Sequence, residues 1–381
     1  MKKVMIVFGT RPEAIKMAPL CLAFREESTI QSIVCVTGQH REMLDQVLHL
    51  FGITPDIDLN IMKKGQDLFD VTAQILQGMK KVIDQYKPDL ILVHGDTTTT
   101  FATSLAAFYS NTKIGHVEAG LRTNNMQAPF PEEFNRQSTG LIADYHFTPT
   151  ELTKENLKKE KKQEQKIIVT GNTVIDALHL VLDIIHKDSE KELYINNFFE
   201  KLLDIDINKS QFVLITGHRR ENFGDGFLNI CHAIKQSAIK NPNTYFIYPV
   251  HLNPNVQQPV KNILSDLSNV LLIEPLEYEN FIYLLEKSYL VLTDSGGIQE
   301  EAPSLGKPVL VMRDVTERPE AIQAGTVKLI GSTKHDIVKN INLLLNNKTI
   351  YRDMSKSHNP YGNGNACKKI VEHVKGVIND C

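Results

Sequence analysis

The sequence predicts an α/β protein that contains two doubly wound parallel sheets. Short runs rich in Val, Ile and Leu alternate with helix-length segments, which is typical of strands buried on both faces of a parallel sheet. The alternation pauses once near the middle of the chain and then restarts. The chain has 381 residues, of which 42% are hydrophobic, and this length exceeds one ordinary domain of about 100–200 residues.

The first series of runs has the order of strands and helices that βαβ units require. Its strands are expected at residues 4–8, 32–37, 90–94, 113–117, 145–148 and 167–170. Its helices are expected at residues 12–26, 41–51, 97–109 and 174–185.

The second series follows residues 187–210, which are charged and lack a clear strand. After it, a turn at 359–365 precedes a last helix at 366–378, which we expect to cross back onto the first domain. The strands of this series are expected at residues 212–216, 244–249, 270–273, 289–293 and 308–311. The predicted domains are residues 1–175 with 362–381, and residues 176–361.

The composition indicates a cytoplasmic protein without nucleic-acid or membrane partners. The formal net charge of −3 argues against general binding to nucleic acid or an anionic membrane. The apolar run before Gly9 is shorter than the ~7–15 residues of a signal-peptide core, and no stretch approaches the ~20 residues of a membrane span. The five cysteines form no C-x-x-C pair, and their odd number fits a reducing compartment.

Polar residues follow the expected strands, and ligands of open α/β sheets bind outside the carboxyl ends of strands. Arg11 and Lys16, after the first strand, could face an anion near a helix N-terminus, or they could belong to an ordinary exposed turn. No G-x-G-x-x-G follows a strand, so no nicotinamide cofactor is expected. No metal-ligand spacing appears either.

Two carboxylates each follow an expected strand, and the two strands are consecutive in the sequence. Asp96 follows the strand at 90–94, where it could serve a reaction or act as the N-cap of the next helix. Glu118 follows the strand at 113–117, and a carboxylate at a buried strand end needs a partner or a role. Arg122 is one structural partner that the sequence offers for Glu118.

Two further segments carry charged groups beside turns. Glu132 and Arg136 are spaced i, i+4 and share a helix face, so they could act on a substrate or form a surface salt bridge of little energy. His218 and the adjacent arginines 219 and 220 follow the first strand of the second series. This cationic group suggests an anion site in which the imidazole supplies charge or a proton.

The segment from Thr293 to Ala302 is the sharpest of these signals. Ser295 could cap a helix, and Gly296 and Gly297 would let a ligand approach the backbone. Free N–H groups and the helix dipole could then bind a diphosphate. Glu301 could accept hydrogen bonds from two ribose hydroxyls. The alternative is a plain glycine-rich turn.

Together, the segments resemble the non-hydrolysing UDP-N-acetylglucosamine 2-epimerase family. The resemblance extends in order over nearly the whole chain. It rests on G-T-R-P-E-A-I-K-M, H-G-D-T-T-T-T, H-V-E-A-G-L-R-T, P-F-P-E-E-F-N-R, G-H-R-R-E-N, D-S-G-G-I-Q-E-E-A-P, R-D-V-T-E-R-P-E and N-P-Y-G-N-G. It implies the GT-B fold, in which two Rossmann-like domains hold a UDP-sugar in the cleft between them.

The resemblance also implies roles for individual residues. The catalytic group would be Asp96, Glu118, Glu132, Arg136 and His218. Besides Asp96, Glu118 and His218, the substrate contacts would be Arg11, Lys16, the uracil-pocket residues Leu276 and Phe281, the diphosphate loop Ser295, Gly296 and Gly297, the ribose carboxylate Glu301, and Arg318.

The implied reaction is reversible epimerisation at C2 of UDP-N-acetylglucosamine, by elimination and re-addition of UDP through a 2-acetamidoglucal. Its product would supply N-acetylmannosamine-type precursors for cell-surface polysaccharide. Reprotonation on the opposite face requires carriers on both sides or one mobile carrier, and which carboxylate serves which face stays open. The resemblance further implies a homodimer that needs no cofactor.

Four alternatives remain from the sequence. A GT-B glycosyltransferase would share the Ser295–Glu301 site but would need an acceptor instead of several carboxylates in the first domain. A UDP-sugar sensor could lose Asp96 or Glu118 without consequence. A hydrolysing epimerase would release UDP and free N-acetylmannosamine. A close relative could epimerise a modified sugar, such as a 3-amino uronic acid or a 6-deoxy derivative.

We predict that the substrate activates this protein weakly. Many bacterial family members bind a second substrate molecule as an activator, at segments that commonly read A-Q-H-R-Q and R-Q-T-L. Here residues 38–42 read G-Q-H-R-E and residues 65–68 read G-Q-D-L, and the exchanges of Gln for Glu and of Arg for Gly disfavour an anionic ligand. Initial rates should therefore rise hyperbolically with substrate concentration. A clearly sigmoidal curve would contradict this expectation.

Overall fold

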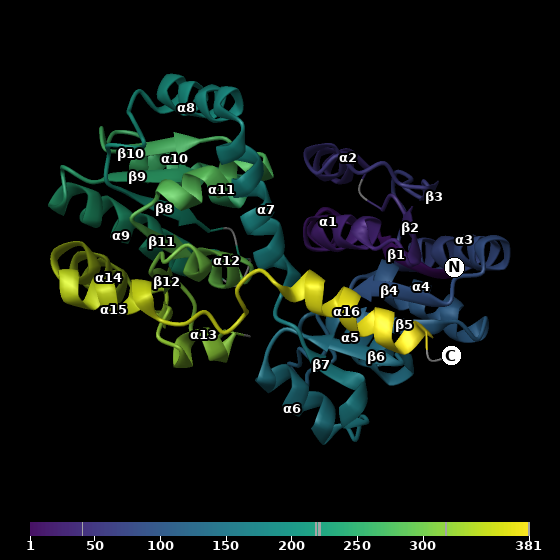
Figure 1. Cartoon of the computed structure of the whole chain (residues 1–381). Helices are drawn as coiled ribbons and strands as arrows, with labels where there is room; N and C mark the ends of the chain where they lie inside the picture. The colour runs from purple at the N-terminus through teal and green to yellow at the C-terminus, as the bar shows by residue number, and fades with distance from the viewer. Residues whose placement is uncertain (40, 218, 220–221, 317, 380–381) are drawn as a thin grey trace. The chain divides into compact units, whose positions relative to one another are not determined.

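The computed structural model of the chain describes residues 1–39, 41–217, 219, 222–316 and 318–379 (Figure 1). It divides into unit 1, Met1–His179 with Tyr361–Cys381, and unit 2, Leu180–Pro360. Each unit holds one parallel sheet flanked by helices, so the predicted α/β class with two doubly wound sheets is confirmed. The predicted cleft between the domains stays a prediction.

Unit 1 is built on a seven-stranded parallel sheet with the order β3-β2-β1-β4-β5-β6-β7. Its strands are β1 (Lys2–Phe8), β2 (Ile30–Val36), β3 (Ile57–Asp58), β4 (Leu90–His94), β5 (Lys113–Val117), β6 (Tyr145–Thr148) and β7 (Ile167–Val169). Its helices are α1 (Arg11–Glu26), α2 (Arg41–Leu50), α3 (Leu68–Tyr86), α4 (Thr98–Tyr109), α5 (Glu132–Ile142), α6 (Glu151–Lys159), the 3-10 turn η1 (Glu164–Lys166), the start of α7 (Thr173–Lys187) and α16 (Ala366–Asn379).

Strand β1 shows why the apolar runs are continuous. Met5 and Val7 pack with buried residues of α3 and α4. Successive side chains of a strand point to opposite faces, so Val4, Ile6 and Phe8 face the other side, and all five side chains are completely buried. Both faces of the strand are therefore covered, as expected for a parallel sheet.

Unit 2 is built on a six-stranded parallel sheet with the order β10-β9-β8-β11-β12-β13. Its strands are β8 (Phe212–Thr216), β9 (Tyr245–Pro249), β10 (Val270–Ile273), β11 (Leu290–Thr293), β12 (Val309–Val311) and β13 (Val327–Leu329). After the end of α7, its helices are α8 (Ser189–Leu203), α9 (Asp225–Lys240), α10 (Pro254–Leu264), α11 (Tyr278–Lys287), α12 (Ile298–Ser304), α13 (Pro319–Gln323), α14 (Lys334–Asn346) and α15 (Lys348–Lys356).

The structure adds elements that the sequence pattern did not predict. The edge strands β3 and β13 span two and three residues, too few to give a periodic signal. The charged segment near residues 187–210 contains helix α8, which Asp188 caps. The buried residues of α8 are Ile195, Phe199 and Leu203, and their i, i+4 spacing makes one narrow apolar face on an otherwise polar helix.

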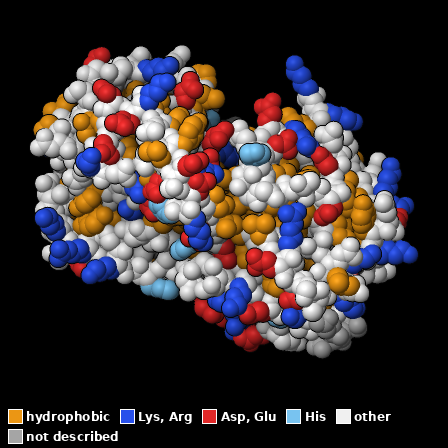
Figure 2. All heavy atoms as spheres, turned by 45° about the horizontal axis from the view of Figure 1, so that its top comes forward, with side chains coloured by type: hydrophobic (Ala, Val, Ile, Leu, Met, Phe, Trp, Pro, Cys, Tyr) orange, Lys and Arg blue, Asp and Glu red, His pale blue; other side chains and the backbone are white. Residues whose placement is uncertain are grey.

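Charged side chains of both signs are exposed on the surface (Figure 2). On the face shown in Figure 2, basic and acidic side chains are interspersed. Among the described residues, none of the helices combines the length and the apolarity that a bilayer crossing needs.

The last helix, α16, belongs to unit 1. In Figure 1, α16 lies along this unit, where it packs against α1. The N–H of Asn172 donates to the carbonyl of Tyr361 at 2.8 Å. Asp176 of α7 accepts hydrogen bonds from the N–H groups of Ala366 at 3.1 Å and Cys367 at 2.9 Å. This buried carboxylate therefore satisfies the first turn of α16.

We expect Asp176→Ala to destabilise the protein by about 1–3 kcal/mol, because two buried N–H groups lose their acceptor. The matched control is Glu372→Ala on α16. Its carboxylate makes only an exposed i, i+4 contact with Lys368 at 4.0 Å, worth less than about 0.5 kcal/mol. Urea unfolding followed by circular dichroism measures both variants. Equal midpoints for the two would contradict the capping role.

Candidate active site

Glu118 lies at the carboxyl end of β5 and is surrounded by polar partners. Its Oε2 forms an ion pair with the Lys16 ammonium and accepts a hydrogen bond from Nδ2 of Asn172 at 3.0 Å. Nε2 of His94 is 3.5 Å from the same oxygen. Only 8% of the Glu118 side chain is exposed, so these contacts replace most of its hydration.

The backbone at Glu118 adopts an uncommon conformation, with φ of 62°. This left-handed region disfavours a residue with a Cβ and costs roughly 1–3 kcal/mol. Such backbone geometry is concentrated at functional sites because the surrounding structure must hold it in place. The turn after β5 therefore orients the Glu118 carboxylate at an energetic cost.

Asp96 follows β4, the sheet neighbour of β5. Its Oδ2 accepts a hydrogen bond from Nη2 of Arg136 at 2.6 Å, and its carbonyl accepts one from Nδ2 of Asn135 at 2.9 Å. Thr97, not Asp96, is the N-cap of α4, so the alternative N-cap interpretation of Asp96 is wrong. Helix α5 instead holds Asp96 through both its side chain and its backbone.

The two carboxyl groups have opposite pKa shifts. Burial raises the pKa of Asp96 above its ordinary value; Arg136 opposes this shift and the charge of Glu118 adds to it. Burial also raises the pKa of Glu118, but Lys16 and His94 outweigh it and hold the pKa well below the ordinary value. Glu118 is therefore a permanent carboxylate near neutral pH, whereas Asp96 gains a proton more easily.

The structure contradicts two ion pairs that the sequence offered as alternatives. Arg122 bonds Glu160, with Nε to Oε1 at 2.6 Å, so a Glu118–Arg122 ion pair is wrong. Arg136 contacts Asp96 and Glu133, the latter at 3.4 Å, so the structural Glu132–Arg136 salt bridge is wrong as well.

The two adjacent glutamates of α5 have different surroundings. Glu133 is completely buried and accepts hydrogen bonds from the N–H groups of Thr123 and Asn124, both at 3.0 Å. Glu133 thus supports the loop before α5. Glu132 is partly exposed, and its charge contributes to the raised pKa of Asp96, so it lies in the same electrostatic environment.

The β1–α1 turn places Arg11 at the first residue of α1 and Lys16 one turn later. Thr10 is the N-cap, and Glu13 completes a capping box with it. Pro12 occupies the first helical turn, as its fixed φ favours. Lys16 reaches Glu118 from this helix, so α1 and β5 meet at the site.

In unit 2, the segment after β11 forms the predicted glycine-rich turn. The N–H of Ser295 donates to Oγ1 of Thr293 at 2.9 Å. Ser295 does not cap α12; the N-cap is Gly297, without a side-chain hydrogen bond. A Cβ at Gly296 would lie 3.2 Å from Cζ of Arg318. The structure thus brings Arg318 against this turn, where its Nε donates to Glu300 at 2.8 Å.

Glu301 is buried one turn into α12, where its Oε1 accepts a hydrogen bond from the hydroxyl of Tyr278 at 2.9 Å. Tyr278 begins α11. The predicted uracil-pocket residues flank it: Leu276 precedes the helix, and Phe281 lies one turn into it, both partly buried. The Tyr278 contact therefore joins the predicted ribose and uracil segments.

The predicted cationic segment after β8 is only partly described. His218 lies outside the described residues, as does residue 220. Asp294, which is fully buried, accepts hydrogen bonds from the N–H of Arg219 at 2.9 Å and from Nδ2 of Asn222 at 3.3 Å. Asp294 therefore fixes both ends of the described part of this loop. Within the described residues, His, Cys, Asp and Glu side chains form no group of three or more that could hold a metal ion.

Comparison with known proteins gives a match over most of the chain. Residues 22–375 match the family model described as UDP-N-acetylglucosamine 2-epimerase. The chain is 56% identical over 380 residues to the UDP-N-acetylglucosamine 2-epimerase of Campylobacter jejuni, covering 100% of this chain and 99% of that protein. It is also 56% identical over 375 residues to the enzyme of Escherichia coli K12, with 98% of each chain covered.

This chain belongs to the UDP-N-acetylglucosamine 2-epimerase family. A crystal structure of the UDP-GlcNAc 2-epimerase from Neisseria meningitidis, bound to UDP-GlcNAc, is similar with a TM-score of 0.90 and 53% identity, covering 98% of this chain and 100% of that one. A glycosyltransferase from Rickettsia africae has a TM-score of 0.64 at 14% identity, which shows a shared GT-B-like fold alone.

Several residues around the epimerase-family motifs were not predicted. His94 and Asn172 contact Glu118, Tyr278 contacts Glu301, and Asp294 holds the loop after β8. His94 and Asp294 lie within recognised motifs, so their positions were available from the sequence. Nothing in the sequence around Asn172 signals its contact, because it depends on folding across 54 residues.

The segments that depart from the family pattern have structural partners here. Arg41 forms ion pairs with Asp45 and Asp58. Asp67 is the N-cap of α3 and forms a capping box with Asp70. His40 lies outside the described residues. Acidic side chains thus already neutralise Arg41, in agreement with a weakened anion site, and the kinetic prediction stays a prediction.

We expect Lys16→Met to destabilise the protein by about 3 kcal/mol at pH 7, because it leaves the buried Glu118 carboxylate without its cation. The pKa of native Glu118 is lowered, so the pair contributes stability above pH ~4.5 that is lost as the pH falls through the native pKa. In the Lys16→Met variant the pKa of Glu118 rises. The loss of stability relative to the wild type should therefore become smaller as the pH falls.

Urea unfolding at pH 7 and pH 5 checks this expectation. Lys158→Met is the control, because Lys158 pairs with Glu155 and Glu164 at the surface, and the loss of such exposed pairs should leave stability almost unchanged. If Lys16→Met loses the same free energy of unfolding at both pH values, the lost charge is not the cause of the destabilisation.

Proposed function

We propose that this chain catalyses reversible epimerisation at C2 of UDP-N-acetylglucosamine, giving UDP-N-acetylmannosamine. Membership of the epimerase family supports the activity. The observation that carries the mechanism is the pair of carboxyl groups at neighbouring strand ends whose pKa values are shifted in opposite directions. Environments that separate two carboxyl groups in this way suit them to different roles in acid–base catalysis.

In the proposed elimination, a carboxylate removes the proton from C2. The electron pair of that C–H bond forms the C1–C2 double bond, and UDP leaves with the electrons of the C1–O bond. Re-addition reverses these steps after a proton arrives on the opposite face of C2. Asp96, whose raised pKa lets it hold a proton, suits the group that exchanges protons with carbon.

Glu118 suits a complementary role. Its lowered pKa keeps it charged, so it would stabilise positive charge that develops on the sugar ring or orient Lys16 toward the substrate. Glu132, which is partly exposed and electrostatically coupled to Asp96, is the candidate for the second proton carrier.

Unit 2 would bind the nucleotide. In the described structure, the N–H groups of Gly296 and Gly297 donate to none of the described residues, and Arg318 lies against Gly296. These groups would bind the diphosphate and stabilise its charge as it departs. Glu301, oriented by Tyr278, would accept the ribose hydroxyls, and Leu276 and Phe281 would flank the uracil.

Deuterium exchange tests the reaction directly. With UDP-N-acetylglucosamine in D₂O, proton NMR should show deuterium at C2 together with formation of UDP-N-acetylmannosamine. We expect Asp96→Asn and Glu118→Gln to reduce exchange by at least about 100-fold, since acid–base groups contribute about 10²–10⁴-fold.

Both variants should still bind UDP, because the proposed nucleotide contacts are in unit 2. Glu160→Gln is the control variant, since this exposed carboxylate pairs with Arg122 away from Asp96 and Glu118. Net release of UDP would favour a hydrolysing enzyme, and turnover only with an added acceptor would favour a glycosyltransferase. If the protein exchanges deuterium into a modified UDP-sugar but not into UDP-N-acetylglucosamine, the modified sugar is the substrate.

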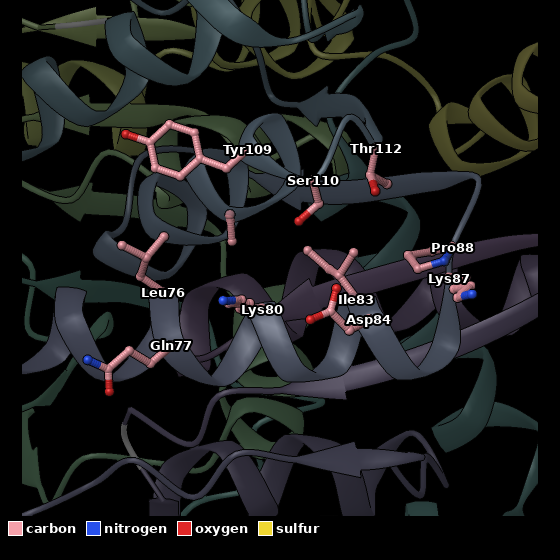
Figure 3. Close-up of a pocket in the computed structure, with 11 residues that line it drawn as sticks. Leu76, Gln77, Lys80, Ile83, Asp84, Lys87, Pro88, Tyr109, Ser110 and Thr112 are labelled. Carbon is pink, nitrogen blue, oxygen red and sulfur yellow. The ribbon is translucent and has the colours of Figure 1, made fainter.

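We also propose that the protein forms a homodimer through an apolar face of unit 1. Helices α3, α4 and α5 pack side by side. They expose large apolar side chains: Phe69 (85%), Phe108 (53%), Tyr109 (69%), Phe134 (47%) and Leu141 (74%). A pocket between α3 and α4 continues this face, with Leu76, Ile83 and Tyr109 beside Lys80 and Asp84 (Figure 3). Several large apolar side chains exposed on three adjacent helices, rather than a single one, indicate an interface.

We expect Phe69→Glu combined with Tyr109→Glu to convert the dimer into a monomer, because two charges would be buried at the interface without partners. Light scattering after size exclusion measures the mass. Tyr194→Glu on α8 is the control, because this tyrosine is equally exposed, at 71%, but lies outside the α3–α5 face. A wild-type monomer, or a dimer that survives the double change, would overturn this interface.

The location that fits this function is the cytoplasm. The four described cysteines are buried and form no disulfide with one another, as expected of thiols in a reducing compartment. The product, a UDP-activated N-acetylmannosamine, would supply enzymes that build cell-surface polysaccharide.

A further inference from the structure

Glu13 is a buried carboxylate that no step of the proposed reaction uses. It is the third residue of α1, and only 2% of its surface is exposed. A glutamate at this helical position ordinarily accepts one hydrogen bond from the N-cap backbone. Glu13 accepts hydrogen bonds from two N–H groups and from the hydroxyls of Thr10 and Thr97, so its role exceeds that of a local cap.

One carboxylate oxygen of Glu13 holds the β1–α1 turn. Oε2 accepts from the N–H groups of Gly9 at 3.0 Å and Thr10 at 2.9 Å, and from the Thr10 hydroxyl at 2.8 Å. This turn leads into Arg11 and the helix that carries Lys16. It is also tightly packed, because a Cβ at Gly9 would lie 1.9 Å from Oγ1 of Thr37.

The other oxygen reaches the β4–α4 turn. Oε1 accepts the hydroxyl proton of Thr97 at 2.6 Å. Oγ1 of Thr100 is 3.2 Å from the same oxygen, but its hydroxyl also donates to the nearer carbonyl of His94. Thr97 is the N-cap of α4, and its Oγ1 accepts the N–H of Thr100 at 3.1 Å. A hydroxyl has one proton, and an ionised carboxylate can only accept. Glu13 therefore fixes the direction of the Thr97 hydroxyl and leaves its lone pairs for the helix N-terminus.

Asp96 directly precedes Thr97 and is held by α5, through Asn135 and Arg136. The residues around Asp96 thus contact two different segments of unit 1. The α5 contacts orient its carboxylate and carbonyl, and the Glu13–Thr97 contact sets where the following helix begins.

We propose that Glu13 is a positioning residue that, through Thr97, fixes Asp96 relative to the turn bearing Arg11 and Lys16. The proposal rests on the proposed function, because it assigns Glu13 to the reaction that Asp96 would perform. A displacement of about 1 Å in a reacting group can lower turnover by about 100-fold. An amide at residue 13 would present one oxygen and one NH₂ group, so either the N–H groups of the turn or the Thr97 hydroxyl would meet a donor in place of an acceptor.

The first test compares Glu13→Gln with Asp336→Asn. Asp336 is also the third residue of its helix and accepts the hydroxyl of the N-cap Thr333 at 2.7 Å, but it is remote from the motif residues in sequence and lies in unit 2. Glu13→Gln should lower kcat by at least about tenfold and change the Kd of UDP by less than about threefold. Asp336→Asn should change neither. An unchanged kcat for folded Glu13→Gln protein would overturn the proposal.

A double-mutant cycle tests the route through Thr97. Thr97→Val should slow turnover about as much as Glu13→Gln, whereas Thr97→Ser, which keeps the hydroxyl, should retain it within about threefold. If the two residues act as one unit, Glu13→Gln adds little in the Thr97→Val background. Fully additive losses would show that Glu13 does not act through Thr97.

A third readout requires no turnover. Asp96, which faces Arg136, Glu118 and Glu132, can be titrated by ¹³C NMR of carboxyl-labelled protein, with Asp96→Asn for assignment. In Glu13→Gln a displaced Asp96 gains water, so its pKa should fall toward 3.8, the ordinary value. An unchanged titration overturns the positioning role even if the wild type is inactive. If the wild type shows no deuterium exchange but the Asp96 titration shifts in Glu13→Gln, only the proposed function is overturned and the positioning role stands.

Discussion

The buried ion pair of Lys16 and Glu118 is the interaction on which the site in unit 1 depends. It joins α1 to the end of β5, and Asn172 extends the contact to the start of α7. A buried carboxylate is tolerated only when charges and donors replace its lost hydration. The left-handed backbone at Glu118 shows that the surrounding contacts hold this carboxylate in an orientation that the local chain does not favour.

The same pair contributes to the electrostatics of its neighbour Asp96. Burial is the main cause of the raised pKa of Asp96; Arg136 opposes this shift, and the charge of Glu118 adds to it. Asp96 and Glu118 thus differ in proton affinity because their surroundings differ, although both are carboxylic acids. Glu13 accepts a hydrogen bond from Thr97, the residue after Asp96, while Arg136 of α5 bonds the Asp96 side chain.

In unit 2, the candidate groups are the backbone of the turn after β11 and the buried carboxylate of Glu301. The turn at Ser295–Gly297 lacks side chains at the point where Arg318 approaches. The hydroxyl of Tyr278 on α11 donates a hydrogen bond to Glu301 on α12. This bond joins the two helices across 23 residues of sequence. The buried Asp294 supports the adjoining loop. The sequence motifs identify these groups, but their orientations depend on these contacts in the folded chain.

The sequence by itself determined the two parallel sheets, because continuous apolar runs such as β1 and β4 and their alternation with helices are local patterns. It also determined the family, since the motif residues lie at strand ends in a fixed order. Tertiary structure decided the partners: Arg122 bonds Glu160 rather than Glu118, Arg136 bonds Asp96 rather than Glu132, and Thr97 rather than Asp96 caps α4. Spacing along a helix or strand restricts which residues share a face, but an ion pair forms where distant segments meet, and only the folded chain sets those distances.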